Sequence, residues 1–119
     1  MSADPMICEV RYFIDQNAMD EFKAYARTWM TLIERYGGTH HGYFISCKGP
    51  AGSPVSFPGT GKDDALDIAI ARFTFPDDAA YARYRQEAAR DPDGMAANSR
   101  YRNDPPFRSY ERIFLERLL

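Results

Sequence analysis

The sequence predicts an α+β fold in which two helices pack on one face of an antiparallel sheet, with the element order βαββαβ. A pattern that occurs twice supports this: an alternating apolar run, an amphipathic helical segment and a second alternating run. The first copy extends from Met6 to Ser46 and the second from Leu66 to Leu115. Both helices have to bury their apolar stripes on the same sheet, so the chain, residues 1–119, is expected to form a single two-layer domain.

The first strand is predicted from Met6 to Ile14, because its residues alternate between two faces. One face is apolar and carries Cys8, Val10, Tyr12 and Ile14. The other face is mixed and carries Ile7, Glu9, Arg11 and Phe13. The strand is therefore expected to pack its apolar face under the helices and to leave the mixed face on the other side of the sheet.

The first helix is predicted to begin after a cap at Asp15 or Asn17 and to end at Gly37 and Gly38. Its apolar residues recur at spacings of three and four: Met19, Phe22, Ala26, Trp29, Ile33 and Tyr36. A second strand is expected from Thr39 to Cys47. The helix and this strand complete the first βαβ unit.

The second unit begins with a strand from Leu66 to Phe75. Pro76, Asp77 and Asp78 then favour the start of a helix. The inner stripe of this helix is predicted to contain Tyr81, Tyr84 and Ala88. The segment Asp91–Gly94 is expected to interrupt it, with a short helical turn over Met95–Tyr101 and a last strand over Phe107–Leu119.

The glycine- and proline-rich segment Lys48–Lys62 is expected to be a surface loop, either a lid over a cleft or a long hairpin connection. Its end, Gly59–Lys62, lacks the remaining residues of a phosphate-binding loop and precedes a strand, so no nucleotide site is expected. Cys8 and Cys47 are predicted to lie at opposite ends of the sheet as free thiols.

The charge balance argues against two classes of partner. Fifteen basic and 17 acidic residues give a net charge of −2 and are mixed along the chain, so neither nucleic acid nor an anionic membrane is expected as a partner. No apolar stretch has the length of a bilayer span, and the first residues lack the features of a signal peptide. The expected location is cytoplasmic.

The two histidines, His40 and His41, are adjacent on a predicted strand and should point to opposite faces. They cannot bind one metal together, and we expect no metal, haem, flavin or other cofactor. A charged group is also predicted on the sheet, formed by Glu9, Arg11, Arg72, Glu111 and Arg112. It could bind an anionic or carbonyl-bearing ligand, or form an ion-pair network that fixes register or a dimer interface.

Several segments together resemble the NIPSNAP domain: Glu9–Tyr12, Met19–Phe22, Ile33–Gly38 with Gly42–Phe44, Arg72–Phe73, Asp91–Pro92 and Glu111–Leu115. The resemblance covers nearly the whole chain. It implies a ferredoxin-like fold that pairs sheet to sheet as a dimeric α/β barrel, and hence a homodimer. It also implies kinship with a superfamily that includes cofactor-independent monooxygenases and isomerases.

Two functions remain open at this point. The first is a protein that binds or transforms a small apolar or aromatic molecule in a cleft lined by Tyr12, Trp29, His41, Tyr43 and Tyr84. In that case His41 would move a proton and Arg72 would hold a carbonyl or oxyanion, as in cofactor-free oxidation or isomerisation of a phenol or enol. The alternative is a non-catalytic homodimeric binding module.

Overall fold

A computed structural model describes residues 4–52, 57, 59–62 and 65–119. These residues form four strands, three α-helices and a 3-10 turn, in this order: β1 (Met6–Phe13), η1 (Gln16–Ala18), α1 (Met19–Arg35), β2 (Thr39–Ile45), β3 (Ile68–Phe75), α2 (Asp78–Arg90), α3 (Pro92–Tyr101) and β4 (Ser109–Leu115). The strands form one sheet of order β2-β3-β1-β4 in which every neighbouring pair is antiparallel. The predicted α+β class and βαββαβ order are thus confirmed, and α3 lies where a short helical turn was predicted, although it is longer.

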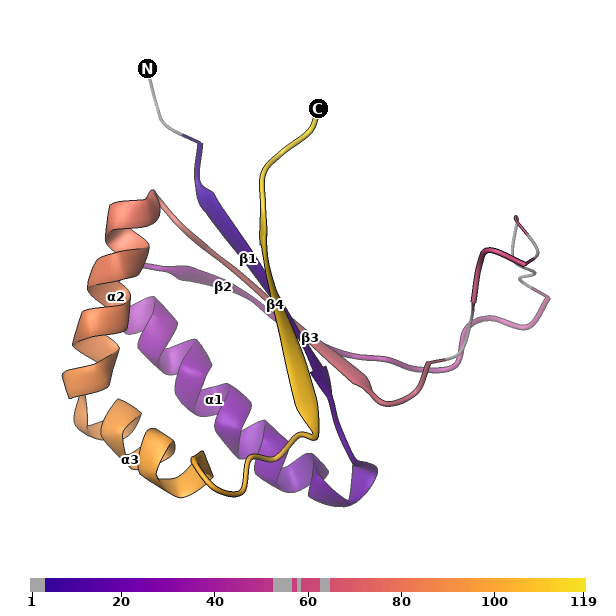
Figure 1. Cartoon of the computed structure of the whole chain (residues 1–119), viewed down its shortest axis with the longest axis horizontal. Coiled ribbons are helices and arrows are strands. Elements are labelled where there is room, and N and C mark those ends of the chain that lie inside the picture. The colour runs from indigo at the N-terminus through magenta and orange to yellow at the C-terminus, as the bar shows by residue number, and fades with distance from the viewer. Residues whose placement is uncertain (1–3, 53–56, 58, 63–64) are drawn as a thin grey trace.

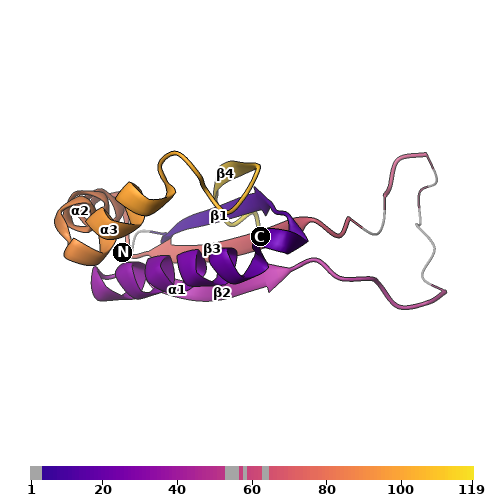
Figure 2. The ribbon, with the colours of Figure 1, turned by 90° about the horizontal axis from the view of Figure 1, so that it is seen from below.

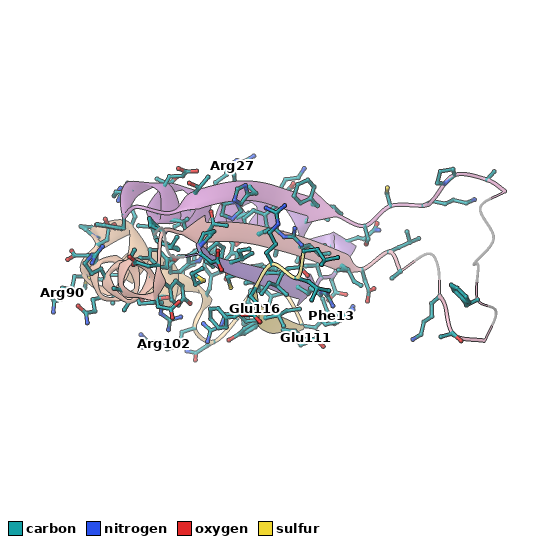
Figure 3. The ribbon with its side chains drawn as sticks, turned by 90° about the horizontal axis from the view of Figure 1, so that it is seen from above. Phe13, Arg27, Arg90, Arg102, Glu111 and Glu116 are labelled. Carbon is teal, nitrogen blue, oxygen red and sulfur yellow. The ribbon has the colours of Figure 1, made fainter. Side chains whose placement is uncertain are left out.

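The helices cover one face of the sheet. Figure 1 shows α1 and the α2–α3 pair on the same side, and in Figure 2 α1 lies in front of β2 and β3. Figure 3 shows the sheet from its other side, which no helix covers. We call this uncovered side the outer face.

The core lies between the sheet and the helices, as the alternation in β1 predicts. Cys8 and Val10 of β1 are buried together with Phe73 and Phe75 of β3. From the helices, the main buried contributions are Phe22, Leu32 and Ile33 of α1 and Tyr84 and Ala88 of α2. The buried Cys8 and the exposed Cys47 are both free thiols.

The helix ends show where local signals predict structure and where they do not. Gly37 adopts a φ of 95°, and the Gly38 N–H donates to the Ile33 carbonyl at 2.8 Å, which ends α1 as predicted. The predicted caps Asp15 and Asn17 are wrong, because η1 precedes α1 and no side chain caps either element. The Asp15 carboxylate instead accepts a hydrogen bond from Arg108 at 2.9 Å.

Two aspartates start α2 and α3. Asp77 accepts from the Ala80 N–H at 2.8 Å and caps α2 as the aspartate pattern predicts, although Pro76 lies before the cap. Asp91 accepts from the Asp93 and Gly94 N–H groups, and Pro92 occupies the first helical position. The predicted interruption is therefore confirmed at Asp91, which separates α2 from α3, but α3 begins at Pro92 and not at Met95, because Pro92–Gly94 is its first turn.

All four strands are shorter than predicted, β1 by one residue, because pairing with a neighbour limits their length. In β4 the paired residues run from Ser109, opposite Phe13, to Leu115, opposite Ile7. β2 pairs with β3 as far as Ile45, opposite Ala69, and β3 begins at Ile68, opposite Phe13 of β1. The described part of Lys48–Lys62 contains no helix or strand, as predicted, while its residues 53–56 and 58 lie outside the described residues.

None of the helices in the described part of the chain is both long and apolar enough to cross a membrane.

Candidate functional site

A cavity of about 360 Å³ lies between the covered face of the sheet and the helices. Four of the five side chains that were predicted to line the cleft line this cavity, namely Tyr12, Trp29, Tyr43 and Tyr84, while His41 does not. They come from β1, α1, β2 and α2, so the folded chain brings together residues that are far apart in the sequence. A volume of this size suits a small organic molecule.

The cavity wall is mainly aromatic, with Tyr12 at its centre. The Tyr12 ring lies edge-on to Phe22 at 5.2 Å and to Tyr25 at 5.7 Å between centroids. Its hydroxyl lies 3.3 Å from the Tyr25 hydroxyl. Tyr25 lines the cavity as well but was not predicted as a site residue. Its position, three residues after Phe22 and four before Trp29, was the available signal, because it puts the three side chains on one side of the helix.

The phenol groups of this wall stay protonated at neutral pH. Burial is the largest cause, and it raises the pKa of Tyr12, Tyr25, Tyr43 and Tyr84. The Trp29 indole nitrogen is buried and has no hydrogen-bond partner among the described residues. The wall therefore offers a ligand hydroxyl groups on an apolar surface.

A basic group also lines the cavity and is formed by Arg85 of α2 and Arg112 of β4. The Nη1 atom of each arginine lies 3.4 Å from the Tyr81 hydroxyl oxygen. Arg112 was predicted to belong to the charged group around Glu9, and this is wrong. It pairs in register with Val10 and so lies on the covered face, whereas Glu111 pairs with Arg11 on the outer face.

His41 and Arg72 do not lie in this cavity. Two residues of β2, His41 and Gly42, lie opposite the single residue Arg72 of β3, which forms a bulge in the pairing. His40 consequently stacks on Tyr43, with 4.9 Å between ring centroids, while the His41 Nε2 lies 3.1 Å from the Thr74 hydroxyl. The prediction that His41 shares a face with Tyr43 is wrong, because the bulge exchanges the positions of the two histidines.

Arg72 belongs to an ion-pair cluster with Glu9 and Arg11 on the outer face. The Glu9 carboxylate accepts from Arg72 Nη2 at 2.7 Å and lies 2.9 Å from Arg11 Nη2. The hydrogen bond from Arg72 is the main reason that the pKa of Glu9 is lowered, although burial opposes it. Of the two predicted alternatives, the geometry favours the ion-pair network, because Glu9 already occupies both guanidinium groups.

Metal binding has no evident place in this arrangement. Within the described ranges, no three histidine, cysteine, aspartate or glutamate side chains are grouped so that they could hold a metal ion. The described residues that line the cavity include no histidine and no carboxylate. The cavity therefore provides an aromatic surface, uncharged hydrogen-bond donors and the positive charges of Arg85 and Arg112.

Solved structures with the same fold carry the family name that the sequence resemblance suggested. A NIPSNAP family protein from Agrobacterium tumefaciens is 20% identical with a TM-score of 0.68, and the match covers 97% of this chain and 87% of that one. An uncharacterized NIPSNAP domain protein from Burkholderia xenovorans is 18% identical with a TM-score of 0.66, covering 94% and 93%. SnoaB, a cofactor-independent oxygenase from Streptomyces nogalater, is 14% identical with a TM-score of 0.59, covering 98% and 96%.

No family model matches the chain, and no curated protein matches it in sequence. The structural matches confirm the fold that the resemblance implies, because they extend over nearly the whole chain. At these identities they establish the fold and leave function to be argued from the site.

Proposed function

We propose that this protein binds a small aromatic or apolar molecule, without a cofactor, in the cavity between the helices and the sheet. The observation that carries the proposal is the cavity of about 360 Å³ lined by aromatic side chains from all four strands and from α1 and α2. Aromatic rings contribute apolar contact, while the tyrosine hydroxyls can orient polar atoms of the ligand. Such a combination is typical of small-molecule sites.

The wall favours binding over proton transfer by its own side chains. The four buried tyrosines keep their protons, and the described lining residues include no histidine or carboxylate that could act as a base. His41 and Arg72, the residues proposed from sequence for catalysis, lie on the outer face. The likeness to SnoaB supports the cofactor-free part of the proposal, since SnoaB is a cofactor-independent oxygenase built on the same fold.

Trp29 is the only tryptophan in the chain and lines the cavity, so its fluorescence reports on binding directly. Titration with 2-naphthol or naphthalene-2-carboxamide should change this fluorescence and raise the melting temperature. A ligand at about 100 times its Kd stabilises the native state by about 2.7 kcal/mol. If neither compound has an effect at concentrations near its solubility limit, the proposed function is wrong.

Matched variants locate the binding. Ala89→Phe places a ring in the cavity lining and should abolish both effects, while Ala82→Phe, also at an exposed site on α2, should retain them. His41→Ala and Arg72→Ala change only the outer face and should bind like the wild type. Loss of binding in the outer-face variants, with binding kept in Ala89→Phe, would contradict the assignment of the site.

We further propose a homodimer formed by the outer faces of two chains. The outer face carries the apolar side chains of Ile7, Phe13, Ile70 and Ile113 around the Glu9 cluster, and no helix covers them. Phe44 and Leu115 on the same face are 60% and 36% exposed. Pairing with a second copy would bury this surface. The uncovered apolar side chains of the outer face also support the second candidate function, a non-catalytic homodimeric module that acts through its surface.

A further inference from the structure

We propose that the molecule bound in the cavity is an aromatic anion whose carboxylate is held between Arg85 and Arg112. This inference rests on the proposed function and narrows the class of ligand. It starts from the placement of two cations from different elements, α2 and β4, in the lining of the same aromatic cavity.

The two guanidinium groups converge on one point. The Nη1 atom of Arg85 and that of Arg112 both lie 3.4 Å from the Tyr81 hydroxyl oxygen. Two positive charges held this close repel each other unless an anion lies between or beside them. The contacts are long for hydrogen bonds, so most of the N–H groups of both arginines are left available to a stronger acceptor.

Neither arginine is neutralised by an acidic side chain among the described residues. The ion pairs in that part of the chain use other arginines, which are Arg11, Arg35, Arg72, Arg100 and Arg108. Arg83 and Arg90 of α2 likewise have no ion pair among the described residues, but they do not line the cavity. Arg27 and Arg102 also have no ion pair among the described residues, and each lines another hollow of the surface. What distinguishes Arg85 and Arg112 is that both line the same cavity and that this cavity is the aromatic one.

The positive field of the pair reaches into the core. Arg112 and Arg85 both lower the pKa of Cys8, although burial is the larger effect and raises it to about 11. Cys8 lies on β1 at the covered face, so the two charges act on the side of the sheet where the cavity is. An anion there gains a favourable interaction without a change of the fold.

The other residues that line the cavity indicate what the carboxylate of the ligand should be attached to. A planar carboxylate matches the donor geometry of guanidinium groups, and the tyrosine and tryptophan rings provide an apolar surface for the attached ring system. A small inorganic anion would leave this surface unfilled. An aromatic carboxylate uses both features.

The test compares naphthalene-2-carboxylate with naphthalene-2-carboxamide, a neutral molecule of nearly the same shape, by isothermal titration calorimetry. The wild type should bind the carboxylate about tenfold or more tightly than the amide, the effect of one charge-assisted hydrogen bond. The double variant Arg85→Gln with Arg112→Gln should lose this preference and keep the affinity for the amide. Arg83→Gln, on an exposed position of α2, should keep the preference.

A second measurement uses only the wild type, in case the double variant is unstable. Raising NaCl from about 0.05 M to about 0.5 M should weaken binding of the carboxylate and leave that of the amide unchanged, because salt screens the arginine charges. Equal affinity for the two compounds, or a preference that persists in the double variant, would overturn this inference and leave the proposed function intact. Failure of both compounds to bind would overturn both.

Discussion

At the scale of single residues, His40 is the histidine that the fold constrains. Its Nδ1 accepts a hydrogen bond from the Gly42 N–H at 2.9 Å, and its Nε2 is buried without a partner in the described part of the chain. Burial is the main reason that the pKa of His40 is lowered to about 4, with Glu34 opposing the shift and His41 adding to it. The ring is therefore neutral at pH 7 and forms part of the packing around Tyr43.

This pKa predicts how stability depends on pH. Between pH 6.5 and about 4 the unfolded chain binds a proton at His40 that the folded chain does not, so stability should fall as the pH drops through that window. The full shift of the His40 pKa corresponds to a loss of about 3 kcal/mol in the free energy of unfolding. Glu9 and Asp91 also have lowered pKa values, and they reduce stability only at pH values below about 4.5.

Urea unfolding measured from pH 7 to pH 4.5 isolates the contribution of His40. In the variant His40→Gln, the free energy of unfolding should depend much less on pH in this range. His41→Gln, at an exposed position, should keep the wild-type dependence. If both variants have the wild-type slope, His40 is not the group responsible.

At the scale of elements, the junction between α2 and α3 depends on a glycine. A Cβ atom at Gly94 would lie 2.0 Å from the carbonyl oxygen of Ala88, which is backbone and cannot move aside. Gly94→Ala should therefore push α2 and α3 apart and destabilise the protein by about 2 to 3 kcal/mol, as overpacking of a core does. Gly49→Ala, where a Cβ would meet nothing within 4 Å, should change stability little. Urea midpoints measure both, and equal midpoints would contradict the proposed packing.

The elements that sequence predicts best are those with a long regular period. The alternation in β1 correctly predicts which of its side chains face the core, and the stripe of α1 identifies Phe22, Ala26 and Ile33 but misses the fully buried Leu32. Two of the cavity residues, Tyr12 and Trp29, follow from these patterns. The α2–α3 connection is harder to predict, because Asp-Pro is compatible both with a break and with the first turn of a helix.

The predicted placement of His41 beside Tyr43 is wrong for a different reason. Strict alternation along β2 assigns faces to His40 and His41, but the bulge at His41 and Gly42 inserts one residue and reverses the assignment. Gly42 has a φ of 112°, so a glycine within a predicted strand was the available signal. The wrong prediction for Arg112 involves no irregularity in its strand. Arg112 directly follows Glu111, and the alternation of side chains along β4 alone puts the two on opposite faces of the sheet.

At the scale of the whole molecule, the two faces of the sheet have separate roles in our proposal. The covered face forms the cavity, and the outer face pairs with a second chain through a surface that is apolar around the Glu9 cluster. Glu9 is 5% exposed even in a single chain, because Arg11 and Arg72 cover it. The Glu9 carboxylate at the centre of the outer face is therefore already paired, so burial against a second sheet leaves this carboxylate compensated, while the cluster of one glutamate and two arginines keeps one positive charge.

Light scattering coupled to size exclusion tests this pairing. The wild type should have twice the 13.6 kDa mass of one chain at micromolar concentration. Ile113→Lys adds a third cation beside Glu9, whose carboxylate already pairs with Arg11 and Arg72 on the outer face, and should shift the mass toward the monomer. Met95→Lys changes an apolar side chain that is 57% exposed on α3, away from the outer face, and should remain a dimer. A monomeric wild type would exclude the pairing, as would an Ile113→Lys variant that stays folded and dimeric, since a dimer through the outer faces cannot bury an added lysine without a partner.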